Sequence, residues 1–204
     1  MAGSLRAIGI DDGFFPLHYK EDRGRTVLVG VLCSGLTPID IAVEGVTVDG
    51  LDGTDAAINV LKRLTRQLRE GGEDAVIFID GVTAAGFNVI DPLKIHEHFH
   101  IPVVTVFKHP LNLERIEDAL RKHFPDWSVR LNIIRSVYGS SRKVNTMWRE
   151  LRLSCFGIDC FKAASLISRL QSMSPLPEPL RLADIIASGL TRDGALLEKL
   201  NKLR

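Results

Sequence analysis

Three aspartates stand at positions from which carboxylates could do chemistry. Asp11 follows the apolar run 5–10, Asp80 follows the run 75–79, and Asp55 opens a segment with helical periodicity. Carboxylate oxygens are ligands that hard cations such as Mg²⁺ prefer, and these ions keep coordination positions open for a substrate phosphate. Two such ions can stabilise the attacking and leaving oxygens of an in-line displacement. These acids could therefore hold Mg²⁺ or Mn²⁺ for a displacement at a phosphate.

An ordinary turn is the alternative interpretation of these acids. Asp-Gly after a strand is a common turn signal. Four Asp-Gly steps fall within residues 12–81, at 12–13, 49–50, 52–53 and 80–81. The spacing by itself does not decide between the two interpretations.

The elements that must position the acids follow from the hydrophobic pattern. Apolar, β-rich runs predict strands at residues 5–10, 26–33, 39–47, 75–79 and 102–107. Helical spacing occurs at residues 55–68, from Asp91 onward, and at 113–123. Three strands joined by turns imply an antiparallel meander, and the alternating strands and helices after it imply parallel strands. The prediction is one α/β domain over residues 1–204, with a mixed sheet of ribonuclease-H-like order flanked by helices.

Asp11 and Asp80 end the first and fourth predicted strands. In open α/β sheets, ligands bind outside the carboxyl ends of the strands, near the point where the strand order reverses. If these two strands are neighbours in the sheet, the two carboxylates meet there.

The last third of the chain gives weaker signals. The polar segment 136–149 predicts a hairpin or a mobile loop, and its Arg142 and Lys143 are candidates for contact with a phosphate backbone. Helical patterns cover residues 160–173 and 180–190, and Asp184 in the second of them is a candidate additional acid.

Composition limits the partners and the compartment. The net charge is +1, so nucleic-acid binding would have to come from a local basic face. No apolar run approaches the ~20 residues that a membrane helix needs, and no secretory signal is evident, so a cytoplasmic protein without membrane contact is expected. Cys155 and Cys160 have no second Cys or His pair at zinc spacing. Buried, reduced thiols are therefore predicted.

Blocks of sequence over almost the whole chain carry a family resemblance. They are GIDDG at 9–13, VTVDGLDGTD at 46–55, FIDGV at 78–82, GFNVID at 86–91, IPVVTV at 101–106, LRKHFPDW at 120–127, PEPLRLA at 177–183 and IIAS at 185–188. The chain resembles the archaeal DUF99 or UPF0215 family, also described as endonuclease dU, which is related to endonuclease V. The resemblance implies a ribonuclease-H-like fold and a metal-dependent endonuclease that acts near a deaminated base, uracil or hypoxanthine, in DNA or RNA.

The resemblance also implies which acids bind metal. The acids of endonuclease V correspond here to Asp11, Asp55 and Asp80. Family members usually carry glutamate where this chain has Asp55, and one missing methylene moves a carboxylate by about 1.5 Å, a misplacement that can cost ~100-fold in rate. Asp49 and Asp52 are therefore alternative ligands.

Further roles come from the same resemblance. Lys108 corresponds to an endonuclease V lysine that would balance charge on the scissile phosphate, and a solvated lysine is the alternative. Phe87 would stack on the modified base, or would simply pack in the core, and Asn88 would bind the edge of the base. The residues expected at the substrate are Asp12, Gly81, Gly86, Phe87 and Asn88.

A second functional hypothesis keeps the fold without the reaction. The near-zero net charge and the shorter acid at Asp55 favour a protein that binds nucleic acid or a nucleotide without cutting it. A homodimer is left open by the sequence.

Overall fold

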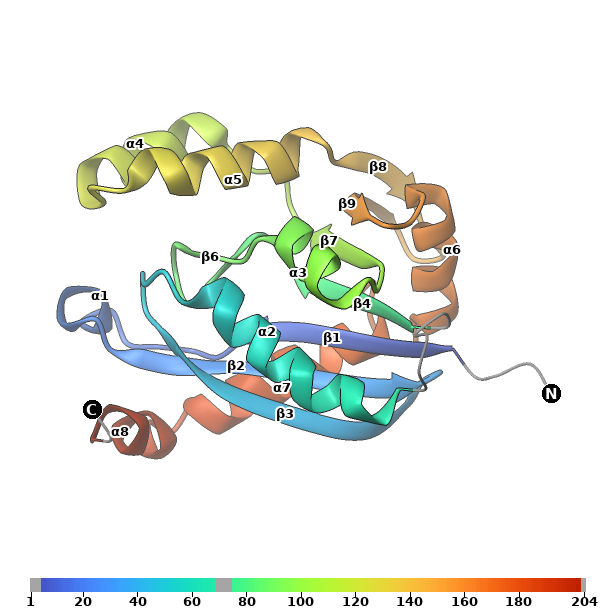
Figure 1. Cartoon of the computed structure of the whole chain (residues 1–204), viewed down its shortest axis with the longest axis horizontal. Coiled ribbons are helices and arrows are strands. Elements are labelled where there is room, and N and C mark those ends of the chain that lie inside the picture. Colours follow the sequence, from blue (N-terminus) through green and yellow to red (C-terminus); the bar gives the residue numbers. More distant parts are fainter. Residues whose placement is uncertain (1–4, 69–74, 203–204) are drawn as a thin grey trace.

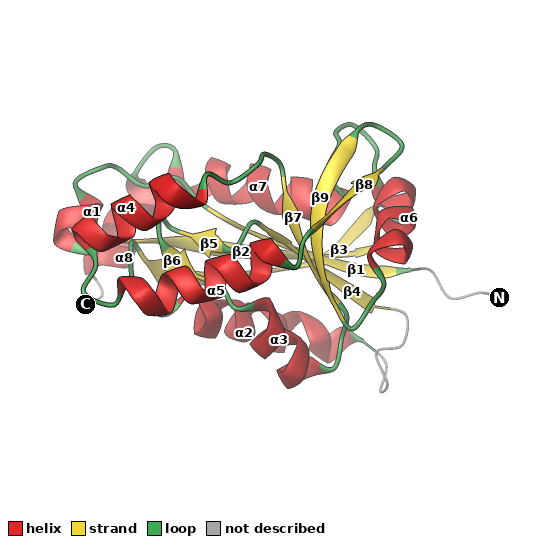
Figure 2. Ribbon diagram, turned by 90° about the horizontal axis from the view of Figure 1, so that it is seen from above, coloured by secondary structure: helices red, strands yellow, loops and turns green. Residues whose placement is uncertain are grey.

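The computed structural model describes residues 5–68 and 75–202, which build a seven-stranded mixed sheet with the order β3-β2-β1-β4-β7-β9-β8 (Figures 1 and 2). Its strands are β1 (Arg6–Asp12), β2 (Arg25–Ser34), β3 (Thr37–Thr47), β4 (Ala75–Asp80), β7 (Val103–Phe107), β8 (Arg142–Asn145) and β9 (Glu150–Phe156). The short strands β5 (Thr83–Ala84) and β6 (Asn88–Val89) pair only with each other.

The strand pairing confirms the predicted ribonuclease-H-like order. β1, β2 and β3 form the expected antiparallel meander. β4 is parallel to β1 on its other side, and β7 is parallel to β4. β9 then runs antiparallel to β7 and pairs with β8 at the edge of the sheet. Because β1 and β4 are neighbours, their carboxyl ends lie side by side.

Helices cover both faces of the sheet. They are α1 (Tyr19–Asp22), α2 (Gly53–Leu64) with the 3₁₀ turn η1 (Thr65–Gln67), α3 (Pro92–Phe99), α4 (Leu113–His123), α5 (Trp127–Gly139), α6 (Cys160–Leu170), α7 (Glu178–Thr191) and α8 (Ala195–Lys202). Figure 1 shows α2 and α3 in front of the sheet and α7 behind it. In the described part of the chain, none of these helices has the length and apolar character to span a membrane.

The two faces follow from the alternation of side chains along each strand. Ile8 and Ile10 of β1 point to the face covered by α2 and α3. Ala7 points to the opposite face, together with Phe78 of β4 and residues of α6 and α7. By the same alternation Asp11 and Asp80 belong to the face of α7.

The helical hairpin of α4 and α5 forms a third apolar cluster beyond the end of β7. Leu120, Leu131 and Ile134 pack there with Phe107 and Val82. Only α4 was predicted from the sequence. α5 and β9 had no clear periodic signal, and the predicted hairpin or loop at 136–149 contains the end of α5, β8 and the turn before β9.

The prediction of reduced thiols is wrong for two of the three cysteines. Cys155 near the end of β9 and Cys160 at the start of α6 form a disulfide, with their Cα atoms 5.7 Å apart. That separation lies within the usual ~4.4–6.8 Å for bridged cysteines. The third, Cys33, is free and buried, and burial raises the pKa of its thiol to about 11.

The first turn of α7 lies directly against β1 at Gly9. A Cβ atom at Gly9 would come within 2.2 Å of main-chain atoms of Pro179 and Leu180. Because main-chain atoms cannot rotate away, we expect Gly9→Ala to lower the free energy of unfolding by about 1–3 kcal/mol. Urea denaturation of the two proteins measures this loss.

Gly189, which lies on α7 itself, offers a matched control for Gly9→Ala. No heavy atom lies within 4 Å of a Cβ built there. Since alanine is favoured over glycine in a helix interior, Gly189→Ala should raise the free energy of unfolding by about 0.5–1 kcal/mol. Equal losses in both variants would contradict a close approach specific to Gly9.

An ion pair holds the beginning of α7. Arg181 donates hydrogen bonds to the carboxylate of Glu178 at 2.6 and 2.9 Å, and Ser172 donates another. The hydrogen bonds from Arg181, with that from Ser172, lower the pKa of Glu178 below its ordinary value of 4.5. The charged carboxylate therefore stabilises the folded protein above pH 4.5, and this stabilisation is lost as the pH falls through the lower folded-state pKa.

Glu178→Gln tests that contribution. At neutral pH the variant should unfold with a free energy about 1 kcal/mol lower than the wild type, because a neutral amide accepts weaker hydrogen bonds from Arg181. The difference should shrink in acid below pH 4.5. Chemical denaturation at both pH values checks the sign, and a difference that grows in acid would contradict the assignment.

Candidate active site

Asp11 and Asp80 meet at the edge of the sheet where β1 and β4 end. The two strands are parallel and pair Ile10 with Ile79, so the next residues, Asp11 and Asp80, lie opposite each other. Asp11 is 8% exposed, and the side chain of Asp80 is 17% exposed. The predicted convergence of these two aspartates is therefore found, and it follows from the parallel register.

Lys108 provides a positive charge to this acid pair. β7 ends one residue before Lys108, and its ammonium forms an ion pair with Asp80. The Nζ atom also lies 3.9 Å from Oδ2 of Asp11. Lys108 thus belongs to the acid pair, and the alternative of an isolated solvated lysine is wrong.

The pKa values reflect the density of charge. Burial raises the pKa of Asp11 well above its ordinary value, and the negative charges of Asp80 and Asp12 raise it further. For Lys108, burial acts to lower the pKa, but the charge and hydrogen bond of Asp80 and the charge of Asp11 outweigh it, so the pKa is raised. Negative charge is therefore concentrated at this edge of the sheet, and the ammonium of Lys108 lies against it.

Asp184 on α7 is within electrostatic reach of the same place. Its negative charge is one of the causes that raise the pKa of Lys108. Ser188, one turn later on the helix, donates a hydrogen bond of 3.4 Å to the Asp184 carboxylate. The additional acid proposed from the sequence therefore comes from the helix that covers this face of the sheet.

Asp55 does not join the acid pair. It lies in the first turn of α2, which packs on the opposite face of the sheet, and its side chain is exposed. Among the residues that the structure describes, no three His, Cys, Asp or Glu side chains are grouped so that they could hold one ion. The predicted cluster of Asp11, Asp55 and Asp80 is therefore not formed.

Asp12 orients a loop at the site. Its carboxylate accepts a hydrogen bond of 2.7 Å from the Ala85 N–H, and Ala85 has the left-handed φ of 47°. Burial raises the pKa of Asp12 to about 6, although the hydrogen bond from Ala85 acts to lower it. Asp12 thus lines the site and also fixes the loop that leads to Phe87.

The other acids near α2 are used within the fold. Asp49 accepts a hydrogen bond of 2.7 Å from the Phe87 N–H, and its carboxylate lies so close to Gly86 that a Cβ atom there would come within 2.3 Å of it. Asp52 accepts hydrogen bonds from the N–H and the hydroxyl of Thr47. These contacts give Asp49, Asp52 and Gly86 structural roles in the loops.

Asn88 does not face a substrate. It is fully buried, and its amide oxygen accepts a 2.7 Å hydrogen bond from the Gly53 N–H. Its amide nitrogen donates to the Thr47 carbonyl at 2.8 Å and to Asp52 at 2.6 Å. The prediction that Asn88 binds the edge of a base is wrong, because both ends of its amide already join α2 to the loop.

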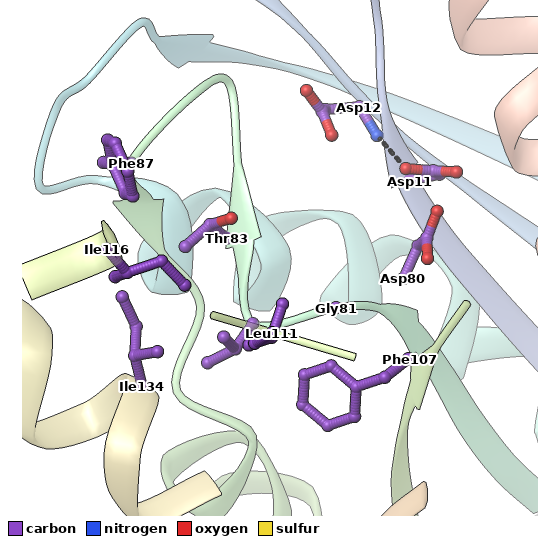
Figure 3. A pocket seen from close by; sticks show the side chains of 11 residues that line it. Asp11, Asp12, Asp80, Gly81, Thr83, Phe87, Phe107, Leu111, Ile116 and Ile134 are labelled. Carbon is purple, nitrogen blue, oxygen red and sulfur yellow. Dashed lines mark hydrogen bonds between the residues drawn. The ribbon is translucent and has the colours of Figure 1, made fainter. Parts of the chain in front are cut away.

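A cavity of about 230 Å³ opens beside the acid pair. Figure 3 shows the aspartates on one side of it and the apolar side chains Leu111, Ile116 and Ile134 away from them. Its lining residues are Asp11, Asp12, Asp80, Gly81, Val82, Thr83, Phe87, Phe107, Leu111, Ile116 and Ile134. A site with carboxylates at one end and apolar walls can hold a cation next to a flat apolar group.

Only some of the residues that line this cavity were predicted from the sequence. Phe87 lines it and also packs edge-to-face on Phe124, with the ring centroids 5.8 Å apart. The packing interpretation is therefore found, and stacking on a base stays a prediction. Gly81 lines the cavity with a φ of +69°. The wall from α4 and α5 was missed, because the apolar residues of α4 resemble any helical core stripe and α5 shows no clear period.

The basic pair on β8 lies outside the cavity lining. Arg142 and Lys143 are exposed, and Lys143 pairs with Glu150 of the neighbouring strand at 2.9 Å. Their contact with a phosphate backbone stays a prediction.

Solved structures of other proteins share this fold. The chain is similar to a crystal structure of a protein of unknown function from Archaeoglobus fulgidus, with a TM-score of 0.75 and 24% identity, over 91% of this chain and 98% of that chain. Human endonuclease V gives a TM-score of 0.56 and 19% identity over 95% and 87% of the two chains. Endonuclease V from Ciona intestinalis, in complex with a 24mer DNA containing an inosine, also gives a TM-score of 0.56, at 12% identity over 98% and 87%. The fold is therefore the ribonuclease-H-like fold of endonuclease V.

Sequence relatives give the family. A UPF0215 protein of Pyrococcus furiosus is 35% identical over 92% of this chain and 93% of its own length. One from Methanothermobacter thermautotrophicus is 38% identical over 92% and 88%. The family model described as endonuclease dU matches residues 3–191. The chain belongs to the endonuclease dU family, and the predicted resemblance is confirmed.

Proposed function

We propose that this protein is a divalent-metal-dependent endonuclease that hydrolyses a DNA phosphodiester near a deaminated base, uracil or hypoxanthine. The observation that carries the proposal is the position of the acid pair at the charged end of an apolar cavity. Membership of the endonuclease dU family and the fold shared with endonuclease V support the class of reaction.

The donor set fits Mg²⁺ or Mn²⁺. Mg²⁺ keeps several waters and is often bound through only one or two carboxylates together with substrate phosphate oxygens. Asp11 and Asp80 would hold the ion, with Asp184 as the nearest further acid. The two carboxylates side by side and the ammonium beside Asp80 support a place that favours positive charge. When bound, such an ion would stabilise negative charge on the phosphate as a Lewis acid.

Lys108 would complete the phosphate site. Its side chain is 31% exposed, so the ammonium can face a phosphate as well as Asp80. A fixed cation beside the phosphate stabilises the charge that develops as the phosphodiester is attacked. Its main-chain neighbour Phe107 lines the cavity, so the phosphate and the base sites adjoin.

The cavity would take the base. Enzymes that read one base of a duplex move it out of the stack into a pocket with apolar or aromatic walls. At about 230 Å³ the cavity is smaller than the roughly 300–1,000 Å³ of pockets for drug-sized ligands, which suits a single base. Phe87 and Phe107 offer aromatic surface, and Thr83 offers a hydroxyl that can bind the base edge.

Cleavage of end-labelled DNA tests the proposal. Strands with one uracil, one hypoxanthine, or neither are incubated with the protein in Mg²⁺, in Mn²⁺ or in EDTA. We expect a discrete cut only in the strands with a deaminated base and only when metal is present. Equal cutting of the undamaged strand would refute the base specificity, and cutting in EDTA would refute the metal dependence.

One observation favours a second candidate, a protein that binds nucleic acid without cutting it. Lys108 neutralises Asp80 directly, and α2 contributes no acid to the described site. Binding that survives chelation, with no scission of any of the strands, would select this candidate.

A further inference from the structure

Residues 146–149, the turn between β8 and β9, are named the hairpin tip. It presents two large apolar side chains to solvent: Met147 is 66% exposed and Trp148 is 49% exposed. Tryptophan is highly buried on average, so a half-exposed indole at the end of a turn is an informative exception.

Hydrogen bonds anchor the backbone of the tip. Within the turn, the Thr146 N–H and hydroxyl donate to the Arg149 carbonyl at 3.1 and 2.8 Å. Two bonds anchor it to the end of α6: the Met147 N–H donates to the Ser168 hydroxyl at 3.1 Å, and the Gln171 amide donates to the Thr146 hydroxyl at 3.0 Å. Groups that are ordered before binding lose less entropy when a ligand binds. The indole is therefore displayed by an ordered support.

The tip lies beside the acid pair. Phe107 at the end of β7 pairs with Arg152 on β9, so β9 begins at the sheet edge where β7 ends. The Arg149 guanidinium donates a 3.4 Å hydrogen bond to the main-chain carbonyl of Lys108, whose ammonium contacts Asp80. Arg149 and Lys108 thus link the exposed indole to the acid pair.

The charges around the indole match a nucleic-acid strand. Arg149 is exposed next to Trp148. Glu150, the acid nearest in sequence, is already paired with Lys143. An exposed aromatic face stacks on any base, and an adjoining cation binds the backbone. Both features together suit a base with its phosphate better than they suit a purely apolar partner.

We propose that the hairpin tip binds an unpaired stretch of the nucleic-acid substrate, with Trp148 stacking on a base and Arg149 contacting the adjoining phosphate. The inference rests on the proposed function for the identity of the substrate. It adds that the strand is single or locally opened where it leaves the acid pair, because a base inside a duplex has no free face for the indole.

Binding in the absence of cleavage is the first test. The full-length protein is titrated with a short, fluorescently labelled single-stranded oligodeoxynucleotide of mixed sequence in EDTA. Trp148→Ala should weaken binding about tenfold, the loss typical of one stacked base. Trp148→Phe should retain most of the affinity. Arg149→Ala should reduce the slope of log affinity against log salt by about 0.7, the value for one phosphate contact on a single strand.

Phe161 supplies the matched control. It is 64% exposed on α6, which begins beyond the opposite end of β9, so Phe161→Ala removes an exposed aromatic side chain away from the acid pair. The affinity of Phe161→Ala for the oligonucleotide should equal that of the wild type. Equal loss in Phe161→Ala and Trp148→Ala, or no loss in either, would overturn the proposal.

Fluorescence gives a readout that does not depend on an alanine variant. The chain has two tryptophans, Trp127 and Trp148. In Trp127→Phe the remaining emission reports on Trp148, and stacking should quench it as the oligonucleotide saturates the protein. Unchanged emission at saturation would overturn the proposal, as would failure of the wild type to bind the oligonucleotide.

The outcomes separate this inference from the proposed function. If the protein binds the strand through Trp148 but never cuts DNA, the nuclease proposal fails and the tip stands as a binding surface. If it cuts DNA while Trp148→Ala binds normally, the inference fails and the nuclease proposal stands. Sedimentation of both proteins adds a third result: a change in oligomeric state without a change in affinity would make the tip a contact between copies and overturn the inference.

Discussion

Replacing Asp80 with asparagine is expected to reduce the rate of metal-dependent DNA cleavage by about 100-fold or more, as loss of one preorganised electrostatic group typically does. The substitution keeps the size of the side chain and removes its charge. It therefore takes away a candidate ligand and also the partner that holds the ammonium of Lys108. Single-turnover cleavage of a uracil- or hypoxanthine-containing strand measures the loss.

The same experiment decides which element supplies any further acid. Asp184→Asn should also slow cleavage, because Asp184 acts electrostatically on Lys108. Asp55→Asn should not, because the Asp55 side chain is exposed on α2. A loss in Asp55→Asn as large as that in Asp80→Asn would show that α2 must contribute to the site during catalysis, and would contradict the acid pair described above.

The folded state should depend strongly on Arg130. This side chain is 4% exposed on α5 and donates to the carbonyls of Gly50 and Phe87 at 2.8 and 2.7 Å. It also pairs with Asp126 at 2.9 Å and lies 4.4 Å from the centre of the Phe124 ring. We expect Arg130→Ala to lower the free energy of unfolding by about 3 kcal/mol, because buried carbonyls and a carboxylate lose their partner together.

Arg121 is a matched control for this prediction. It too pairs with an acid four residues away, Glu117, and lies 4.0 Å from an aromatic ring centre, that of Trp127. Its side chain, however, is 55% exposed. Arg121→Ala should therefore cost less than about 1 kcal/mol in the same denaturation experiment. Similar losses in the two variants would show that burial of the guanidinium is not the source of the effect.

Arg130 also connects stability to the site. One of the two carbonyls that it binds belongs to Phe87, a wall of the cavity. Arg130→Lys keeps a charge in the same place but loses the fork of donors that reaches two carbonyls and a carboxylate. If this variant stays folded, its affinity for a strand with a deaminated base should fall more than its rate of cleavage at saturation.

Local pattern was enough to predict most of the sheet. The meander and the helix–strand alternation are found as predicted. β2, β4 and β7 are buried along most of their length and read as apolar runs, and α4 reads as an amphipathic helix. The sequence did not predict α5 or β9. α5 buries Arg130 among its apolar residues, and β9 mixes exposed and buried residues, so neither shows a clean period.

The acids show which features of the site local pattern could not predict. Asp11 and Asp80 could be paired from the sequence, since the ends of neighbouring parallel strands must meet. Asp55 could not be placed, because a helix rotates successive residues by about 100° and its packing decides which of them face the sheet. Asn88 looked like a free loop amide, but the return of the chain past α2 gives it three partners.

What the sequence determined by itself was the fold class, the family and the two aspartates at the strand ends, because these depend on local periodicity and on short motifs. The tertiary structure alone decided that Lys108 lies against Asp80, that Asp55 is turned away, and that Cys155 and Cys160 are bridged. It also decided that α4 and α5 close a cavity beside the acids. Those features depend on distances between segments far apart in the chain or on the direction of a turn, and neither is encoded in the period of one segment.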